Sequence, residues 1–135
     1  MNIAVVDTDV VSFLFKGHSL ALQYLPHLAH RTLIVSFMTI AELDRWVLEA
    51  NWGVTRQNKL REYLKPFAIF PYNRELCAKW AEVTVSAQAQ GRRIECADAW
   101  IAATALLAGA PLITHNRSDY LGVQGLEIIS HPDHY

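Results

Sequence analysis

Five short apolar runs recur along the chain, and longer stretches with apolar residues at helical spacing separate them. Most of the runs are rich in β-branched residues, which is typical of strands that are buried on both faces of a parallel sheet. They occupy positions 3–6, 33–35, 68–70, 112–113 and 126–129. We therefore expect a small parallel sheet of four to five strands.

The stretches between these runs predict helices. The first, at positions 12–29, is expected as two pieces broken near Gly17, and further helices are expected at 39–52, 55–64, 74–90 and 95–107. Thr39 is followed three residues later by Glu42, which matches the capping-box pattern. This pattern predicts a helix start at Thr39, with Glu42 in the first turn.

Strands that alternate with helices predict a three-layer α/β domain built from right-handed crossovers. No repeat, low-complexity tract or linker interrupts the 135 residues, so we expect a single domain over 1–135. In such a sheet, ligands bind outside the carboxyl ends of the strands, near the point where the strand order reverses. Functional residues are therefore expected just after strands.

Composition narrows the class of protein without identifying a partner. Hydrophobic residues make up 52% and charged residues 19%, which excludes a disordered or fibrous chain, and the net charge of −1 favours no partner. Cys77 and Cys96 lack zinc-ligand spacing and are expected to be small buried residues in a reducing cytoplasm. The apolar run at 3–6 is stopped by Asp7, so we expect a cytoplasmic protein without a signal peptide or membrane span.

Several acidic residues lie close after predicted strands or early in predicted helices, near the carboxyl ends of the strands where ligands are expected to bind. Asp7 ends the first strand and Asp9 follows it, Glu42 and Asp98 lie early in helices, and Asp119 comes after the fourth strand. The last three also have local explanations as capping, dipole or turn residues, whereas Asp7 has no such simple explanation. Crowded carboxylates repel one another unless a cation neutralises them, and oxygen ligands suit a hard divalent ion. Such an ion activates water and stabilises charge on a phosphate, which indicates phosphodiester hydrolysis.

Four segments of the chain resemble the PIN domain, and more narrowly the VapC-type toxins of type II toxin–antitoxin systems. They are positions 5–9 (VVDTD), 39–43 (TIAEL), 94–105 (IECADAWIAATA) and 112–120 (LITHNRSDY), in the order and spacing of the family. The resemblance implies a PIN-like fold, Mg²⁺- or Mn²⁺-dependent endoribonuclease activity, frequent homodimers and inhibition by a cognate antitoxin.

The resemblance also implies roles for individual residues. The acids that match its metal-ligand and catalytic positions are Asp7, Glu42, Asp98 and Asp119. Thr8 and Thr114 match hydroxyl positions that hydrogen-bond the carboxylates, and Asn116 matches the polar position beside the fourth acid. Whether Asp119 or Asn116 completes the site is left open, and Tyr120 stands where the family commonly has phenylalanine.

Cations are needed to bind an RNA backbone. Arg92, Arg93 and Arg117 flank the acidic segments and are expected to contact substrate, preferably single-stranded or loop RNA. A second basic group on the helix expected at 55–64 and just after it, made of Arg56, Lys59, Arg61 and Lys65, is explained as well by an ordinary solvated face. The apolar residues Trp46, Val47, Leu48 and Trp52 are a candidate surface for a partner subunit or an antitoxin.

Other functions remain open from sequence. Asp7 and Asp9 after an apolar strand also suit a haloacid-dehalogenase-type phosphatase, with Asp7 as nucleophile, although Glu42 and Asp98 then have no role. A non-catalytic module that binds RNA or protein is a second alternative. A PIN enzyme acting on structured DNA or in ribosomal RNA processing is a third.

Overall fold

The computed structural model describes residues 2–131, so positions 1 and 132–135 of the expected domain lie outside it. Within this range, five parallel strands form one sheet in the order β3-β2-β1-β4-β5. They are β1 (Ile3–Val6), β2 (Thr32–Ser36), β3 (Ala68–Phe70), β4 (Leu112–Ile113) and β5 (Ile128–Ile129). The predicted parallel sheet is confirmed, and because β2 and β4 pair with opposite sides of β1, the strand order reverses at β1 and β4.

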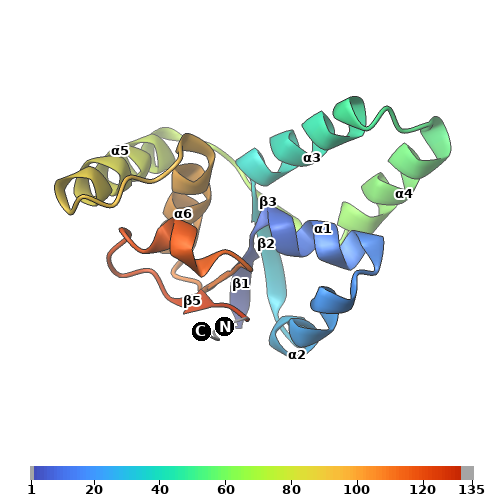
Figure 1. The fold of residues 1–135 in the computed structure, drawn as a ribbon, viewed down its shortest axis with the longest axis horizontal. Helices are drawn as coiled ribbons and strands as arrows, with labels where there is room; N and C mark the ends of the chain where they lie inside the picture. Colours follow the sequence, from blue (N-terminus) through green and yellow to red (C-terminus); the bar gives the residue numbers. More distant parts are fainter. Residues whose placement is uncertain (1, 132–135) are drawn as a thin grey trace.

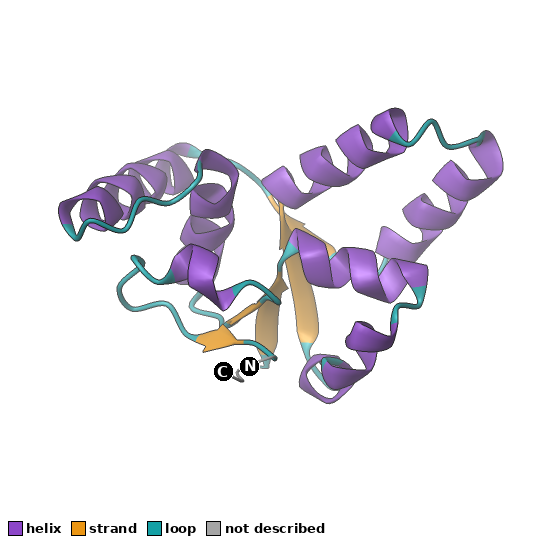
Figure 2. Ribbon diagram, in the orientation of Figure 1, coloured by secondary structure: helices purple, strands orange, loops and turns teal. Residues whose placement is uncertain are grey.

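Helices cover both faces of this sheet and complete the predicted three-layer α/β fold (Figures 1 and 2). On one side lie α5 (Arg74–Ala89) and α6 (Cys96–Ala108). On the other side lie α1 (Thr8–Lys16), α2 (Leu25–Leu28), α3 (Phe37–Glu49) and α4 (Val54–Leu64). Two 3₁₀ turns, η1 (Ser19–Gln23) and η2 (Arg117–Tyr120), complete the described elements. No helix within residues 2–131 is both long and apolar enough to cross a membrane.

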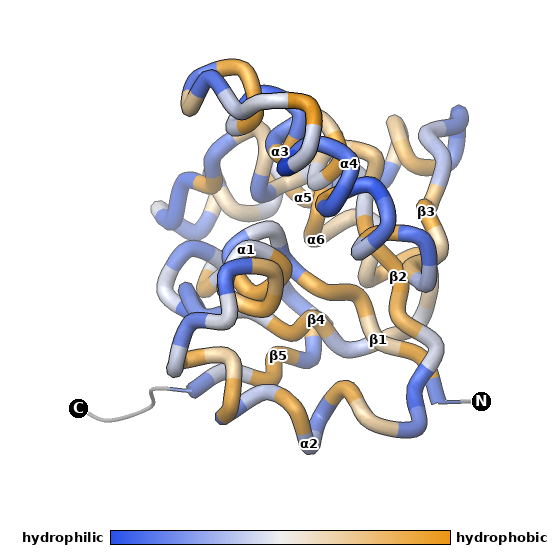
Figure 3. Tube along the Cα trace, turned by 90° about the vertical axis from the view of Figure 1, so that its right-hand side faces the viewer, coloured by the Kyte–Doolittle hydropathy of each residue, from blue (hydrophilic) through white to orange (hydrophobic). Residues whose placement is uncertain are grey.

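The central strand β1 joins two hydrophobic cores, because successive side chains of a strand point to opposite faces. Val5 packs into the core under α5 and α6, whereas Ala4 and Val6 pack into the core under α1, α3 and α4. In Figure 3, β1 and its neighbour β2 are coloured mostly as hydrophobic residues. The expectation that every strand is buried on both faces is wrong for β3. This strand lies at the edge of the sheet, and its Ile69 is 56% exposed.

The first helix begins earlier than the apolar pattern predicts, at Thr8 and not at Ser12. The reason is that Asp7 is the N-cap, with its carboxylate accepting a hydrogen bond from the Thr8 backbone N–H at 2.7 Å. The predicted break near Gly17 is confirmed, because Gly17 ends α1 with φ +66°. The second piece is the turn η1 followed by the short α2, not a regular helix.

The predicted start of α3 is wrong. β2 runs directly into the helix, and Ser36 caps it by accepting a hydrogen bond from the Met38 N–H at 3.0 Å. Thr39 is therefore already inside the first turn and fully buried, and Glu42 lies in the second turn. Glu42 is not a capping residue, and its carboxylate is available for contacts with α1.

The two cysteines also differ from expectation. Cys77 is partly exposed, and Cys96, the first residue of α6, is exposed. Neither is the small buried residue that the composition suggested, because the first turn of α6 meets solvent at position 96.

Candidate active site

Asp7 lies at the centre of the candidate site, at the carboxyl end of β1 where the strand order reverses. Its Oδ1 accepts a hydrogen bond from the Thr8 N–H at 2.7 Å, and its Oδ2 accepts from the hydroxyls of Thr114 at 2.7 Å and Tyr120 at 2.8 Å. Only 6% of the residue is exposed. Burial raises the pKa of Asp7, and the charge of Glu42 adds to this, while the hydrogen bonds act in the opposite direction. The carboxylate is thus fixed in one orientation by three donors.

Glu42 reaches the site from α3 through contacts with α1. The Thr8 hydroxyl donates to Glu42 Oε1 at 2.7 Å and lies 2.9 Å from the Thr39 hydroxyl. Thr39 is fully buried between the helices. The expected hydrogen bonds from Thr8 and Thr114 to carboxylates are therefore present, one to Glu42 and one to Asp7.

Asp98 enters from the first turn of α6 and meets Asp7 through a shared tyrosine. The Tyr120 hydroxyl lies 2.8 Å from Asp7 Oδ2 and 3.3 Å from Asp98 Oδ1. Burial, followed by repulsion from Asp7 and Asp119, raises the pKa of Asp98 to about 7. Burial and the charges of Asp7 and Asp98 raise the pKa of Tyr120. The Tyr120 hydroxyl therefore stays protonated and acts as a donor.

Asp9 belongs to the same group of acids and organises the loop after β4. Its Oδ2 accepts hydrogen bonds from the His115 backbone N–H at 3.1 Å and from the Asn116 side-chain amide at 2.8 Å. Burial and then the charge of Asp7 raise the pKa of Asp9 to about 7. Asn116 was expected beside the fourth acid, and its side chain bonds to Asp9. The Asp-Thr-Asp pattern pointed to Asp9, but only the structure gives it these partners.

Asp119 lies in η2 on the exposed rim of the group. Its charge acts on both Asp98 and Asp9, so it is close enough to influence their ionisation. Arg117, in the same turn, directs its guanidinium to the Ile128 carbonyl at 3.5 Å. This contact ties Arg117 to β5.

Arg92 and Arg93 are exposed in the segment between α5 and α6. The chain just after η2 packs closely against this segment, because a Cβ added to Gly122 would lie 2.6 Å from the Arg92 carbonyl oxygen. The Gln90 side-chain amide also donates to the Gly122 carbonyl at 3.3 Å. This packing fixes the backbone at Arg92 against the chain that follows η2.

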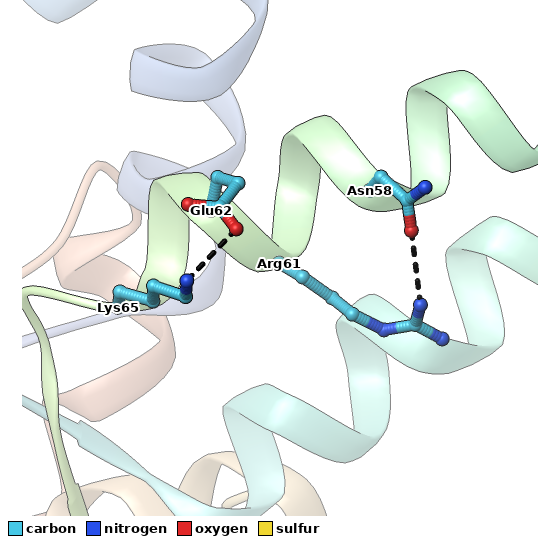
Figure 4. Close-up of polar contacts among 4 residues, drawn as sticks. All are labelled: Asn58, Arg61, Glu62 and Lys65. Atoms are coloured by element: carbon cyan, nitrogen blue, oxygen red, sulfur yellow. Dashed lines mark hydrogen bonds and ion pairs between the residues drawn. The ribbon is translucent and has the colours of Figure 1, made fainter.

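Two basic residues of α4 and its C-cap, Arg61 and Lys65, interact along their own helix. Arg61 donates to Asn58 at 3.2 Å, and Lys65 pairs with Glu62 at 2.8 Å, as Figure 4 shows. α4 lies on the side of the sheet opposite α6, which carries Asp98 (Figure 1). These contacts favour the interpretation of this group as a solvated helix face.

Trp46 and Trp52, near the connection between α3 and α4, pack mainly against the hydrophobic core. Trp46 and Trp52 have ring centroids 4.5 Å apart and pack against the core on the α1–α4 side, and Arg56 stacks over Trp52 at 4.1 Å. Val47 packs with them, whereas Leu48 is 79% exposed. Only part of the predicted apolar partner surface therefore meets solvent.

The set of oxygen donors suits a hard divalent cation. The charge of Asp7 raises the pKa of both Asp9 and Asp98, and the charge of Glu42 raises the pKa of Asp7, so these acids repel one another in a way that a divalent cation would relieve. Within residues 2–131, no three His, Cys, Asp or Glu side chains stand close enough to ligate one ion together. This spacing is compatible with Mg²⁺, which takes one or two carboxylates directly and keeps several waters.

Comparison with known proteins gives one consistent family. The sequence model of the PIN domain matches residues 4–120. The VapC ribonuclease Y4jK of Sinorhizobium fredii is 31% identical, and the plasmid stability protein StbB of Pseudomonas syringae pv. tomato is 33% identical; each alignment covers 93% of this chain and 95% of the relative.

Solved structures agree with this match. VapBC2 from Rickettsia felis, bound to a DNA fragment from its promoter, has a TM-score of 0.84 at 22% identity and covers 95% of this chain and 98% of its own. VapBC-1 from nontypeable Haemophilus influenzae has a TM-score of 0.80 at 25% identity and covers 95% and 97%. The family match, the fold and the grouped acids lead to the same conclusion: the chain belongs to the PIN-domain family, in its VapC branch.

Proposed function

We propose that the chain is a divalent-metal-dependent endoribonuclease that acts as the toxin of a toxin–antitoxin pair. The observation that carries the proposal is the meeting of Asp7, Glu42 and Asp98 at one edge of the sheet in a PIN-family chain. Relatives from Sinorhizobium fredii and Haemophilus influenzae, at 31% and 26% identity, are named VapC ribonucleases. The phosphatase alternative is not favoured for two reasons. Asp7 Oδ2 already accepts hydrogen bonds from two hydroxyls, and a phosphatase of this type would leave Glu42 and Asp98 without a role.

In this proposal Asp7 and Asp98 hold Mg²⁺ or Mn²⁺ directly, while Glu42 and Asp119 hold its waters or a second ion. When bound, the ion supplies positive charge for the phosphate and activates water. Thr8 and Thr114 keep the carboxylates of Glu42 and Asp7 in place. These residues therefore prepare an oriented set of oxygens before RNA arrives.

Asn116 has a supporting role in the same proposal. Its amide holds Asp9, which in turn accepts the His115 N–H, so the loop after β4 is tied to the first turn of α1. This loop leads directly into η2, which carries Asp119 and Tyr120. The position of both residues relative to Asp7 therefore depends on the Asn116–Asp9 contact.

The requirement for metal tests the proposed activity. Treatment with EDTA is expected to abolish cleavage of a fluorescent single-stranded RNA, and excess Mg²⁺ or Mn²⁺ is expected to restore it, because the acidic group repels phosphate until a cation is present. Hydrolysis of p-nitrophenyl phosphate is measured in parallel. Full RNA cleavage in EDTA, or turnover of p-nitrophenyl phosphate without RNA cleavage, would contradict the proposal.

Arg92 and Arg93, together with Arg117 on η2, are proposed to bind the RNA backbone. The double variant Arg92→Ala/Arg93→Ala is expected to raise KM for RNA and to weaken the dependence of cleavage on salt, since fewer counterions are released on binding. Lys65→Ala is the matched control, because Lys65 pairs with Glu62 on α4. Cleavage assays from 50 to 200 mM salt measure both effects, and equal losses in the control and the double variant would refute the assignment.

A cognate antitoxin is the proposed protein partner, since structural neighbours are VapBC pairs and a toxin–antitoxin complex from Klebsiella pneumoniae. A homodimer is proposed as the assembly of the chain itself. The exposed Leu48 on α3 and Val54 at the start of α4 are apolar surface available for such contacts.

A further inference from the structure

We propose that Tyr120 selects the cation of the site, because its hydroxyl leaves Asp7 with a single free coordination position. Tyr120 is a positioning residue in this inference and not a metal ligand. The inference rests on the proposed function in one respect only, namely that Asp7 binds the ion.

The count of acceptor positions on Asp7 carries the inference. A carboxylate has two oxygens and about four lone-pair directions. Thr8 N–H occupies one position on Oδ1, and the hydroxyls of Thr114 and Tyr120 occupy both positions on Oδ2. All three contacts are short, at 2.7, 2.7 and 2.8 Å. One position on Oδ1 is left, so Asp7 can bind a metal only through one oxygen.

The structure holds the Tyr120 hydroxyl firmly in this place. The residue is 1% exposed and packs in the core under α5 and α6 with neighbours such as Ala102 and Leu112. The ring cannot swing away without disturbing that core. The same hydroxyl lies 3.3 Å from Asp98 Oδ1, so it also stands between the two carboxylates that are proposed to bind the ion.

Single-oxygen binding by Asp7 favours small cations. Mg²⁺ requires near-octahedral geometry and takes one or two carboxylates, each through one oxygen, whereas Ca²⁺ takes six to eight oxygens and often binds a carboxylate through both. Mn²⁺ shares the preference of Mg²⁺ for a small octahedral set of oxygens. With Oδ2 of Asp7 occupied, the site lacks an oxygen that Ca²⁺ would use. Phenylalanine at position 120 would fill the same volume and would free one position on Oδ2.

The test compares two cations in the Tyr120→Phe variant. Binding of Mn²⁺ is measured by titration with electron paramagnetic resonance, and binding of Ca²⁺ by its displacement of Mn²⁺, on the full chain without RNA. Loss of a group that orients a metal ligand costs about 10- to 100-fold in affinity. We expect this loss for Mn²⁺ and a smaller one for Ca²⁺, so that the ratio of Ca²⁺ to Mn²⁺ affinity rises about tenfold.

Controls separate this role from a merely structural one. Tyr24→Phe removes another fully buried hydroxyl, which bonds to the Thr114 carbonyl, the His115 ring and the His131 carbonyl, and it should leave the ratio unchanged. Thr114→Val removes the other donor to Asp7 Oδ2 and should raise the ratio as Tyr120→Phe does. An unchanged ratio in Tyr120→Phe would overturn the inference, whatever the result for Thr114→Val. Absence of Mn²⁺ binding to the wild-type chain would instead overturn the proposed metal site itself.

Discussion

Asp7→Asn is expected to abolish RNA cleavage while the chain stays folded. Loss of even an outer partner of a metal ligand lowers activity 10- to 100-fold, so loss of the ligand charge should lower kcat/KM by more than about a hundredfold. The fold should tolerate asparagine, because its oxygen can accept from the Thr8 N–H and its amide can face the Thr114 and Tyr120 hydroxyls, which can rotate to accept. Steady-state cleavage and a thermal melt measure the two effects.

Asp44→Asn provides a matched control for this change. Asp44 lies two residues after Glu42 on α3 but is exposed, and it should keep full activity. Cleavage by Asp7→Asn at a rate near that of the wild type would contradict the assignment. A non-cooperative melt would show that Asp7 is needed for folding, and Asp98→Asn, on the less buried carboxylate, would then carry the test of activity.

The stability of the chain should depend on pH in EDTA, and Mg²⁺ should remove most of this dependence. Burial and neighbouring carboxylates raise the pKa of Asp9 and Asp98 to about 7 from the ordinary aspartate value of 3.8. Between these values the folded chain binds more protons than the unfolded chain, so stability falls as pH rises through about 7. Mg²⁺ binds the ionised carboxylates and should therefore stabilise the chain more at pH 8 than at pH 6.

Thermal melts at pH 6 and pH 8, with EDTA or with Mg²⁺, measure this coupling. At Mg²⁺ about a hundredfold above Kd, the melting temperature at pH 8 should rise by on the order of 10 °C. The shift at pH 6 should be clearly smaller. The variant Asp98→Asn should reduce the pH dependence seen in EDTA. A Mg²⁺ shift equal at the two pH values would show that the cation does not bind these carboxylates.

The sequence was sufficient to predict the sheet and the position of its acids. Strand β1 is a continuous apolar run that ends at Asp7, and both features follow from burial on two faces and from the location of sites in parallel sheets. The resemblance to the PIN domain, and not this rule, singled out Thr114 after β4, where its hydroxyl meets Asp7. Parallel pairing brings these distant segments together, so a local pattern predicts a long-range contact.

Other features depend on contacts that no local pattern contains. The capping-box pattern at Thr39 competed with Ser36, and Ser36 caps α3 because β2 enters the helix without a loop. Thr39 and Glu42 then turn toward Thr8 of α1. Their partners could be found only once the packing of α1 against α3 was known.

The contribution of Tyr120 was likewise out of reach from sequence. Its hydroxyl meets Asp7 and Asp98 because η2 folds back over the carboxyl ends of β1 and β4, and that path depends on Asn116 holding Asp9. A tyrosine near an acid is an ordinary surface pattern in a sequence. Its burial and its two carboxylate neighbours give it significance here.

Anomalous diffraction from crystals soaked in Mn²⁺ would show whether Asp7 and Asp98 share one divalent cation. We expect an anomalous peak in contact with one oxygen of Asp7 and with the Asp98 carboxylate. No peak between these two residues at saturating Mn²⁺, or a peak only at other acidic side chains, would contradict this expectation.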